Sequence, residues 1–217
     1  MNEHFWWYLA RSSGLVAWSM LTATVIWGIL LSTKVLPTQR RPLWLQAVHR
    51  WLAGLTVSFL AVHLASLLLD SYVEFDVADI VIPFRTDWKP AAVALGILAM
   101  WLLVAVELTS IAMRRLSRRV WRGVHLGSYL VFWSTSLHAA FAGSDVTSPV
   151  YRVTAVASVA AVAWALMYRI ATRRAVRRAE RRAAVPGRSA SPGQDRSERD
   201  PRPAHHGAAE RTLEVTT

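Results

Sequence analysis

Four histidines lie inside apolar, helix-length stretches of this 217-residue chain, and they form two pairs. His49 and His63 are 14 residues apart in one stretch, and His125 and His138 are 13 apart in another. An ionisable side chain within a membrane span marks a functional site by default. Each spacing corresponds to roughly 20 Å along a helix. Two such helices side by side would place a His–His pair at each of two depths. A metal or haem iron at each depth would explain why the imidazoles are there.

The elements that must position these histidines are membrane-spanning helices. Crossing the hydrocarbon core takes about 20 apolar residues. Five stretches qualify: 9–31, 43–69, 90–112, 120–142 and 149–171. A hydrophobic content of 53% and 11 tryptophans fit an integral membrane protein. Aromatic residues lie near span ends, as an interfacial belt requires: Trp6, Trp7, Tyr8, Trp44, Trp88 and Trp121. The N-terminus has no basic region or cleavage site typical of a signal peptide. We expect an all-α, polytopic membrane bundle of five transmembrane helices.

Charge in the connections predicts the orientation of these helices. The connections after spans one and three are basic and contain no acid, and Arg173 to Arg182 holds six arginines against one glutamate. The 70–89 connection is acidic instead, with five acids against two basic residues. The positive-inside rule then places the N-terminus outside and the C-terminus in the cytoplasm. We therefore expect a multi-pass protein of the cell (plasma) membrane.

The formal net charge of +11 mainly reflects this topology together with attraction to anionic lipid. Nucleic-acid binding is not expected, because no aromatic-interleaved basic module accompanies the arginines. The absence of cysteine excludes iron–sulfur ligation, covalent c-type haem and disulfides.

Three regions follow along the chain. Residues 1–8 form an outer N-terminal segment, 9–171 the transmembrane domain, and 172–217 a cytoplasmic tail. The tail is basic at first, and beyond Ala183 it is rich in Pro, Gly, Ser and charged residues, which predicts disorder. It has no Gly-rich phosphate loop and could not hold a flavin or nicotinamide domain.

The predicted topology pairs the histidines by depth. His49 and His125 fall toward the cytoplasmic face, and His63 and His138 toward the outer face. Facing helices commonly build cofactor sites in this way. Gly54 and Gly127, with small neighbours, would let a flat macrocycle approach the backbone.

The two spacings differ in helical phase. At about 100° per residue, 14 residues leave an offset of about 40°, whereas 13 leave about 140°. The fourth span must therefore bend, contain a local irregularity, or present its ligands from flanking faces. Gly127 and residues 134–136 are candidate soft points.

The His pairs on alternate helices resemble the ferric-reductase-like transmembrane domain family. The segments that carry this resemblance, over about residues 5–171, are WYLARSSGLVAW, HRWLAGL, AVHLASLLLDSYV, VAVELTS and WRGVHLGSY. They look like the stand-alone actinobacterial type, a dihaem b membrane subunit. Its relatives are the haem subunit of the periplasmic methionine-sulfoxide reductase system and the membrane domain of NADPH oxidases. The resemblance implies that His49, His63, His125 and His138 are axial ligands of two b-type haems. It also implies that the first of six core helices and the fused flavin/nicotinamide domain are missing.

Four charged residues lie close to the predicted ligands. Arg50 and Arg122 neighbour the inner pair and Arg11 the outer end of span one, where each could bind haem propionates or anchor to lipid phosphate. Glu107 lies within span three. We expect it to pair with Arg50 or Arg122, with a proton relay as the alternative.

The expected function is transmembrane electron transfer, with no catalytic side chain. The donor would be a cytoplasmic flavoprotein or a membrane quinol, with flavin only on the partner. The acceptor, ferric iron or a partner reductase, would bind outside. The 70–89 connection is the expected acceptor surface through its aromatic residues Tyr72, Phe75, Phe84 and Trp88, and its acids would attract ferric ions. The chain would then be the haem-binding component of an oxidoreductase and not autonomous. The alternatives are a His-lined metal-ion transporter, disfavoured by the lack of proline in the interior of spans one to four, and a structural membrane subunit.

Overall fold

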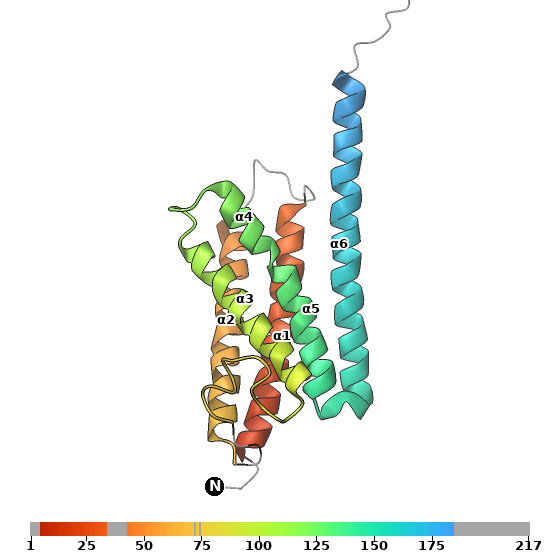
Figure 1. Ribbon diagram of the computed structural model, residues 1–217. Helices are drawn as coiled ribbons and strands as arrows, with labels where there is room; N and C mark the ends of the chain where they lie inside the picture. The colour runs from red at the N-terminus through yellow and green to blue at the C-terminus, as the bar shows by residue number, and fades with distance from the viewer. Residues whose placement is uncertain (1–4, 34–42, 72, 74, 185–217) are drawn as a thin grey trace, which may run out of the picture. The chain divides into compact units, whose positions relative to one another are not determined.

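The computed structural model describes residues 5–33, 43–71, 73 and 75–184, and within these ranges the regular structure is entirely helical. Figure 1 shows the helices, which are α1 (Phe5–Ser32), α2 (Leu43–Leu69), α3 (Pro90–Ile111), α4 (Arg118–Leu126), α5 (Ser128–Ala142), the short 3₁₀ helix η2 (Asp145–Thr147) and α6 (Pro149–Ala184). The prediction of an all-α protein is confirmed. Four of the described helices are long and apolar enough to cross a membrane: α1, α2, α3 and the Pro149–Arg182 part of α6. The protein is therefore a multi-pass membrane protein.

The predicted span 120–142 is two helices and not one. α4 ends at Leu126, and Gly127 closes a tight turn in which its N–H donates to the Val124 carbonyl at 2.8 Å. A Cβ at Gly127 would lie 2.8 Å from that carbonyl oxygen, so the turn requires glycine. This break accommodates the 13-residue spacing, because it changes the helical phase between His125 and His138. Residues 134–136, the other candidate soft point, lie within the continuous helix α5.

Two helices extend beyond the ranges that hydropathy predicts. α1 begins at Phe5, so the described part of the predicted outer segment 1–8 is helical. α6 continues through the arginine-rich segment to Ala184, because alanine and arginine are both strong helix formers. The expectation of disorder beyond Ala183 falls on residues 185–217, which lie outside the described residues. Contacts divide the chain into a unit of residues 1–177, which contains the four histidines of the predicted spans, and a unit of residues 178–217.

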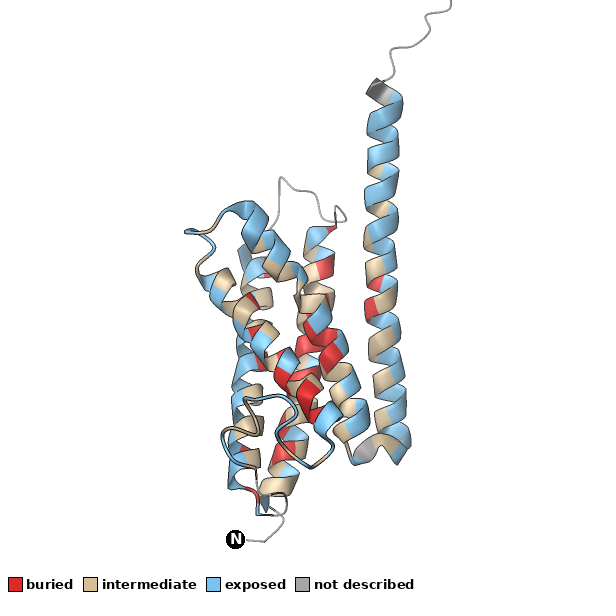
Figure 2. Cartoon of the chain, in the orientation of Figure 1, coloured by how far each residue is buried: buried red, intermediate tan, exposed pale blue. Residues whose placement is uncertain are grey.

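The core forms where α1, α3, α5 and α6 meet. α1 packs along α2 and α3 packs along α5. Figure 2 shows the buried residues concentrated in the middle of these helices, and the largest fully buried side chains include Phe132, Ile29, Val131 and Val162. Since lipid is as apolar as leucine, close packing and interhelical hydrogen bonds must supply the specificity.

Indole N–H groups supply three of these hydrogen bonds. Trp18 donates to the Ser136 hydroxyl at 3.0 Å and joins α1 to α5. Trp27 donates to the Leu45 carbonyl at 2.9 Å and joins α1 to α2. Trp101 donates to the Val81 carbonyl at 3.1 Å and fixes the 70–89 loop on α3. Tryptophan therefore holds the helices together as well as marking span ends.

The orientation can be tested with reporter fusions. The 70–89 loop lies at the same end as the start of α1, and α4 lies at the opposite end (Figure 1). With the arginine-rich end inside, a reporter fused after residue 180 should be active only in its cytoplasmic form. A reporter inserted at residue 144 should be active only in its external form. The reverse pattern would show that the arginine-rich end lies outside.

Candidate functional site

We call His63 and His138 the outer pair and His49 and His125 the inner pair, after the predicted topology. The outer pair is oriented by main-chain carbonyls of neighbouring helices. His63 on α2 donates from Nδ1 to the Ala10 carbonyl on α1 at 2.7 Å. His138 on α5 donates from Nδ1 to the Ala92 carbonyl on α3 at 2.8 Å. Because a carbonyl only accepts, the proton must be on Nδ1 in both rings. The Nε2 lone pair of each neutral ring is therefore left for a ligand.

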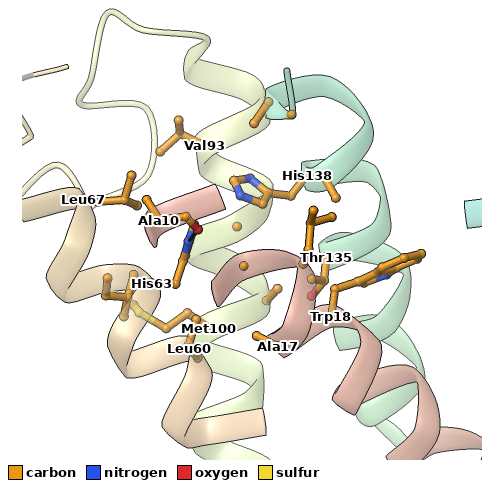
Figure 3. A pocket seen from close by; sticks show the side chains of 18 of the residues that line it. Ala10, Ala17, Trp18, Leu60, His63, Leu67, Val93, Met100, Thr135 and His138 are labelled. Carbon is orange, nitrogen blue, oxygen red and sulfur yellow. Dashed lines mark hydrogen bonds between the residues drawn. The ribbon is translucent and has the colours of Figure 1, made fainter. Parts of the chain in front are cut away.

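Both outer histidines line one apolar cavity of about 210 Å³. Figure 3 shows His63 and His138 projecting into it from different helices, with Leu60, Met100 and Ala17 among the other lining side chains. Arg11 lies at the cavity wall, with its guanidinium 5.9 Å from the Trp7 ring centroid. The cavity is shaped for a largely hydrophobic group that meets two imidazoles and a cationic side chain.

The inner pair comes from α2 and α4. The ring centroids of His49 and His125 are 6.2 Å apart, so a single metal with bonds of about 2.0 Å could contact both rings. The Trp121 ring stacks on His125 at 5.1 Å. Nδ1 of His125 lies 3.5 Å from the Ser110 hydroxyl on α3. Nδ1 of His49 is buried and makes no hydrogen bond. The main-chain group beside it is the Thr24 carbonyl of α1.

Three glycines are packed against histidine rings and were not predicted from the sequence. A Cβ on Gly14 would lie 3.0 Å from His63, on Gly28 3.1 Å from His49, and on Gly96 2.8 Å from His138. Gly14 and Gly28 are 14 residues apart on α1 and match the 14-residue spacing of the histidines on α2. That shared interval was a signal present in the sequence.

Gly54 and Gly127, which the sequence suggested would lie beside a macrocycle, do not contact the histidine rings. Gly54 was expected to make room for a macrocycle, but a Cβ added there would have no neighbouring heavy atom within 4 Å, so this residue faces open space. Gly127 forms the turn between α4 and α5. Proximity in sequence to a histidine was a poor guide, because the space beside each ring is made by the neighbouring helix.

Of the four charged residues that were predicted near the ligands, one lines the outer cavity. Arg11 lines the outer cavity. Arg50 and Arg122 lie on the exposed surfaces of α2 and α4. Glu107 is half-buried on α3, and among the described residues no ion pair joins it to Arg50 or Arg122. The expected ion pair is therefore wrong in this structure.

A family comparison decides the class of protein. The family of ferric reductase-like transmembrane components matches residues 13–136, more than half of the chain. The chain belongs to this family. Comparison with curated proteins and with solved structures gives no significant match. Family membership indicates a role in transmembrane electron transfer. The matched residues include His49, His63 and His125 and end two residues before His138.

The residues fit the haem that domains of this family typically bind. Among the described residues no group of three or more His, Asp or Glu side chains could hold a bare metal ion. Each level of this ferric reductase-like domain instead offers two imidazoles, and a porphyrin needs only two axial ligands from protein. The carbonyl bonds at Nδ1 are the usual way in which a ligating histidine is oriented.

One further residue pair belongs to the inner level. Arg169 on α6 donates to the Tyr129 hydroxyl on α5, and its guanidinium lies 5.8 Å from the Tyr129 ring centroid. The Arg169 charge is also within electrostatic range of His125. This arginine was not predicted from the sequence, because it lies inside the apolar stretch 149–171 and not in a connection.

Two carboxylates of the acidic loop are paired within the loop itself. Arg85 pairs with Asp76 at 3.0 Å and with Asp79 at 3.2 Å. The Asp79 backbone N–H donates to Asp76, and this bond with the Arg85 charge lowers the pKa of the Asp76 carboxyl. Of the predicted acceptor aromatics, Phe75 and Trp88 line the outer cavity and Phe84 is exposed. Tyr72 lies outside the described residues.

The glycine contacts can be tested by a matched pair of substitutions. Gly96→Ala would place a methyl 2.8 Å from His138 Nδ1 and force the ring to move. Overpacking of this kind costs about 1–3 kcal/mol, so the unfolding midpoint of the protein in detergent should fall. Gly54→Ala meets nothing within 4 Å and should leave the midpoint unchanged or raise it, because alanine favours helix. Equal effects of the two substitutions would show that the glycine–histidine contact is unimportant.

Proposed function

We propose that this protein carries electrons across the cell membrane through two b-type haems. His63 and His138 would ligate the outer haem, and His49 and His125 the inner one. The observation that supports this most is the orientation of the outer pair, in which both Nδ1 atoms are bonded to carbonyls and both Nε2 atoms keep a lone pair for iron. The haem would supply the reversible one-electron chemistry, and the protein would supply binding, orientation and electrostatics.

The surrounding residues have definable tasks at each level. The Ala10 and Ala92 carbonyls fix ring orientation and raise the basicity of the outer ligands. The apolar lining, to which the 70–89 loop contributes Phe75 and Trp88, would give the outer group a largely apolar environment. Arg11 is placed to bind carboxylates of the outer group, and Arg169 those of the inner group, since arginine pairs with carboxylates through charge-assisted hydrogen bonds. Arg122 and Arg50 are left for the inner surface and the lipid phosphates.

The partners follow from this arrangement. A cytoplasmic flavoprotein or a membrane quinol would donate electrons at the inner level. The six arginines of Arg173 to Arg182 could attract an acidic flavoprotein as well as anionic lipid. Ferric iron or a partner reductase would accept electrons at the outer face of the plasma membrane.

Removal of one ligand tests the pairing. His63→Ala or His138→Ala should each abolish the outer haem and retain the inner one, because each level depends on its own pair. Haem per protein, measured as the pyridine haemochrome, should fall by about half. His205→Ala, outside the spans, serves as the control and should keep both haems. Two intact haems in either ligand variant would refute the pairing.

Nicotinamide oxidation tests the division of labour. Residues 1–217 alone should not oxidise NADH or NADPH, because hydride acceptance normally requires a flavin and haem accepts single electrons. The 46 residues of 172–217 are fewer than the roughly 50 of even a small domain. Dithionite should reduce the purified protein, and NADPH should do so only with an added flavoprotein reductase. Rapid reduction by NADPH of flavin-free protein would contradict this.

A further inference from the structure

We infer that Ser110 makes the inner haem level different from the outer one, by weakening the hydrogen bond that its ligand His125 can form. The inference rests on the proposed function and concerns a positioning residue. It assigns the inner level a more positive reduction potential than a glycine at position 110 would give.

The outer level shows the reference arrangement. In an α-helix the carbonyl of residue i points toward residue i+4, so a histidine that donates to that carbonyl lies beside the side chain at i+4. His63 donates to Ala10 and abuts Gly14, and His138 donates to Ala92 and abuts Gly96. A glycine at i+4 leaves room for the ring to lie against the backbone beside that carbonyl.

The same pattern of residues recurs on α3 at the level of the inner pair. Ser110 is 14 residues after Gly96, and Val106 is 14 residues after Ala92. The Val106 carbonyl therefore corresponds to the acceptor of His138. Here, however, the Ser110 hydroxyl donates to the Val106 carbonyl at 2.7 Å. Serine in a helix often bonds back to the carbonyl four residues earlier in this way.

His125 is consequently left with a poorer partner. Its Nδ1 lies 3.5 Å from the Ser110 hydroxyl oxygen, against 2.7 and 2.8 Å for the carbonyl bonds of the outer histidines. A separation of 3.5 Å is at the outer limit for a hydrogen bond. Ser110 also carries a Cβ at the position that corresponds to Gly96, where a Cβ would lie 2.8 Å from His138.

The chemical consequence follows from ligand basicity. A strong Nδ1–H···O=C bond makes an imidazole a better electron donor to its metal, which stabilises the ferric over the ferrous state. A weak bond does the opposite, and hydrogen bonding to the axial ligands is a recognised determinant of haem potential. Ser110 therefore favours the reduced state at the inner level relative to a glycine.

The test is spectropotentiometry of the full-length, haem-loaded protein. The His63→Ala variant should lack the outer haem, so its titration identifies the inner component. The His49→Ala variant should lack the inner haem and identifies the outer component. Ser110→Gly frees the Val106 carbonyl and lets His125 approach it. The ferrous-to-ferric ratio of the inner component at fixed ambient potential should then fall about three- to tenfold, the effect of one hydrogen bond, or about 28 to 59 mV for one electron. The outer component should not move.

Two further variants keep the test decisive. Ser110→Ala retains the Cβ but removes the hydroxyl, so the inner ratio should shift in the opposite direction. Ser110→Thr retains the hydroxyl and should restore the wild-type ratio. Opposite signs from Gly and Ala would not arise from a loss of packing alone. An unmoved inner component in both Gly and Ala variants, or equal shifts of both components, would overturn the inference. Wild-type protein that binds no haem would overturn the proposed function itself.

Discussion

The level of His63 and His138 depends on one interaction, the hydrogen bond from a histidine Nδ1 to a main-chain carbonyl of the next helix. An imidazole inside a membrane cannot leave this donor unpaired without a large cost. The carbonyls of α1 and α3 are already used within their own helices, but each has a second lone pair. Reaching it requires the histidine helix to approach within side-chain distance of the backbone. That approach explains why Gly14, Gly28 and Gly96 stand where they do.

The close approach of a histidine-bearing helix to its neighbour occurs twice, once between α1 and α2 and once between α3 and the α4–α5 pair. On α1 and α2 the partners and the ligands share a 14-residue interval, close to four helical turns. On α3 the partners keep that interval, from Gly96 to Ser110, while the ligands are 13 apart. An unbroken helix would turn one of the two histidines away from α3. The tight turn at Gly127 corrects the phase, so a local irregularity in α4–α5 is a consequence of ligand geometry.

The sequence was sufficient for the features that act within one helix. Apolar length identified α1, α2 and α3, and the depth argument placed His49 beside His125 as the structure has them. Features that depend on the register between helices were not accessible in this way. Gly54 was chosen because it is close to His49 in sequence, whereas the glycines that touch the rings are on α1 and α3. Arg169 was overlooked and the Glu107 ion pair was wrongly expected, because contacts between distant segments decide both.

The outer loop illustrates how pairing changes the meaning of composition. Five acids in 70–89 predict a surface that attracts cations. Asp70 is buried, and Asp76 and Asp79 share Arg85, so much of that charge is used to order the loop. The ordered loop in turn places Phe75 and Trp88, whose rings meet edge to face at 6.1 Å, against the cavity of His63. The loop therefore forms part of the wall of the outer cavity as well as carrying charge. Paired carboxylates and aromatic rings thus act together here: the ion pairs hold the loop in shape, and that shape sets the aromatic wall beside His63.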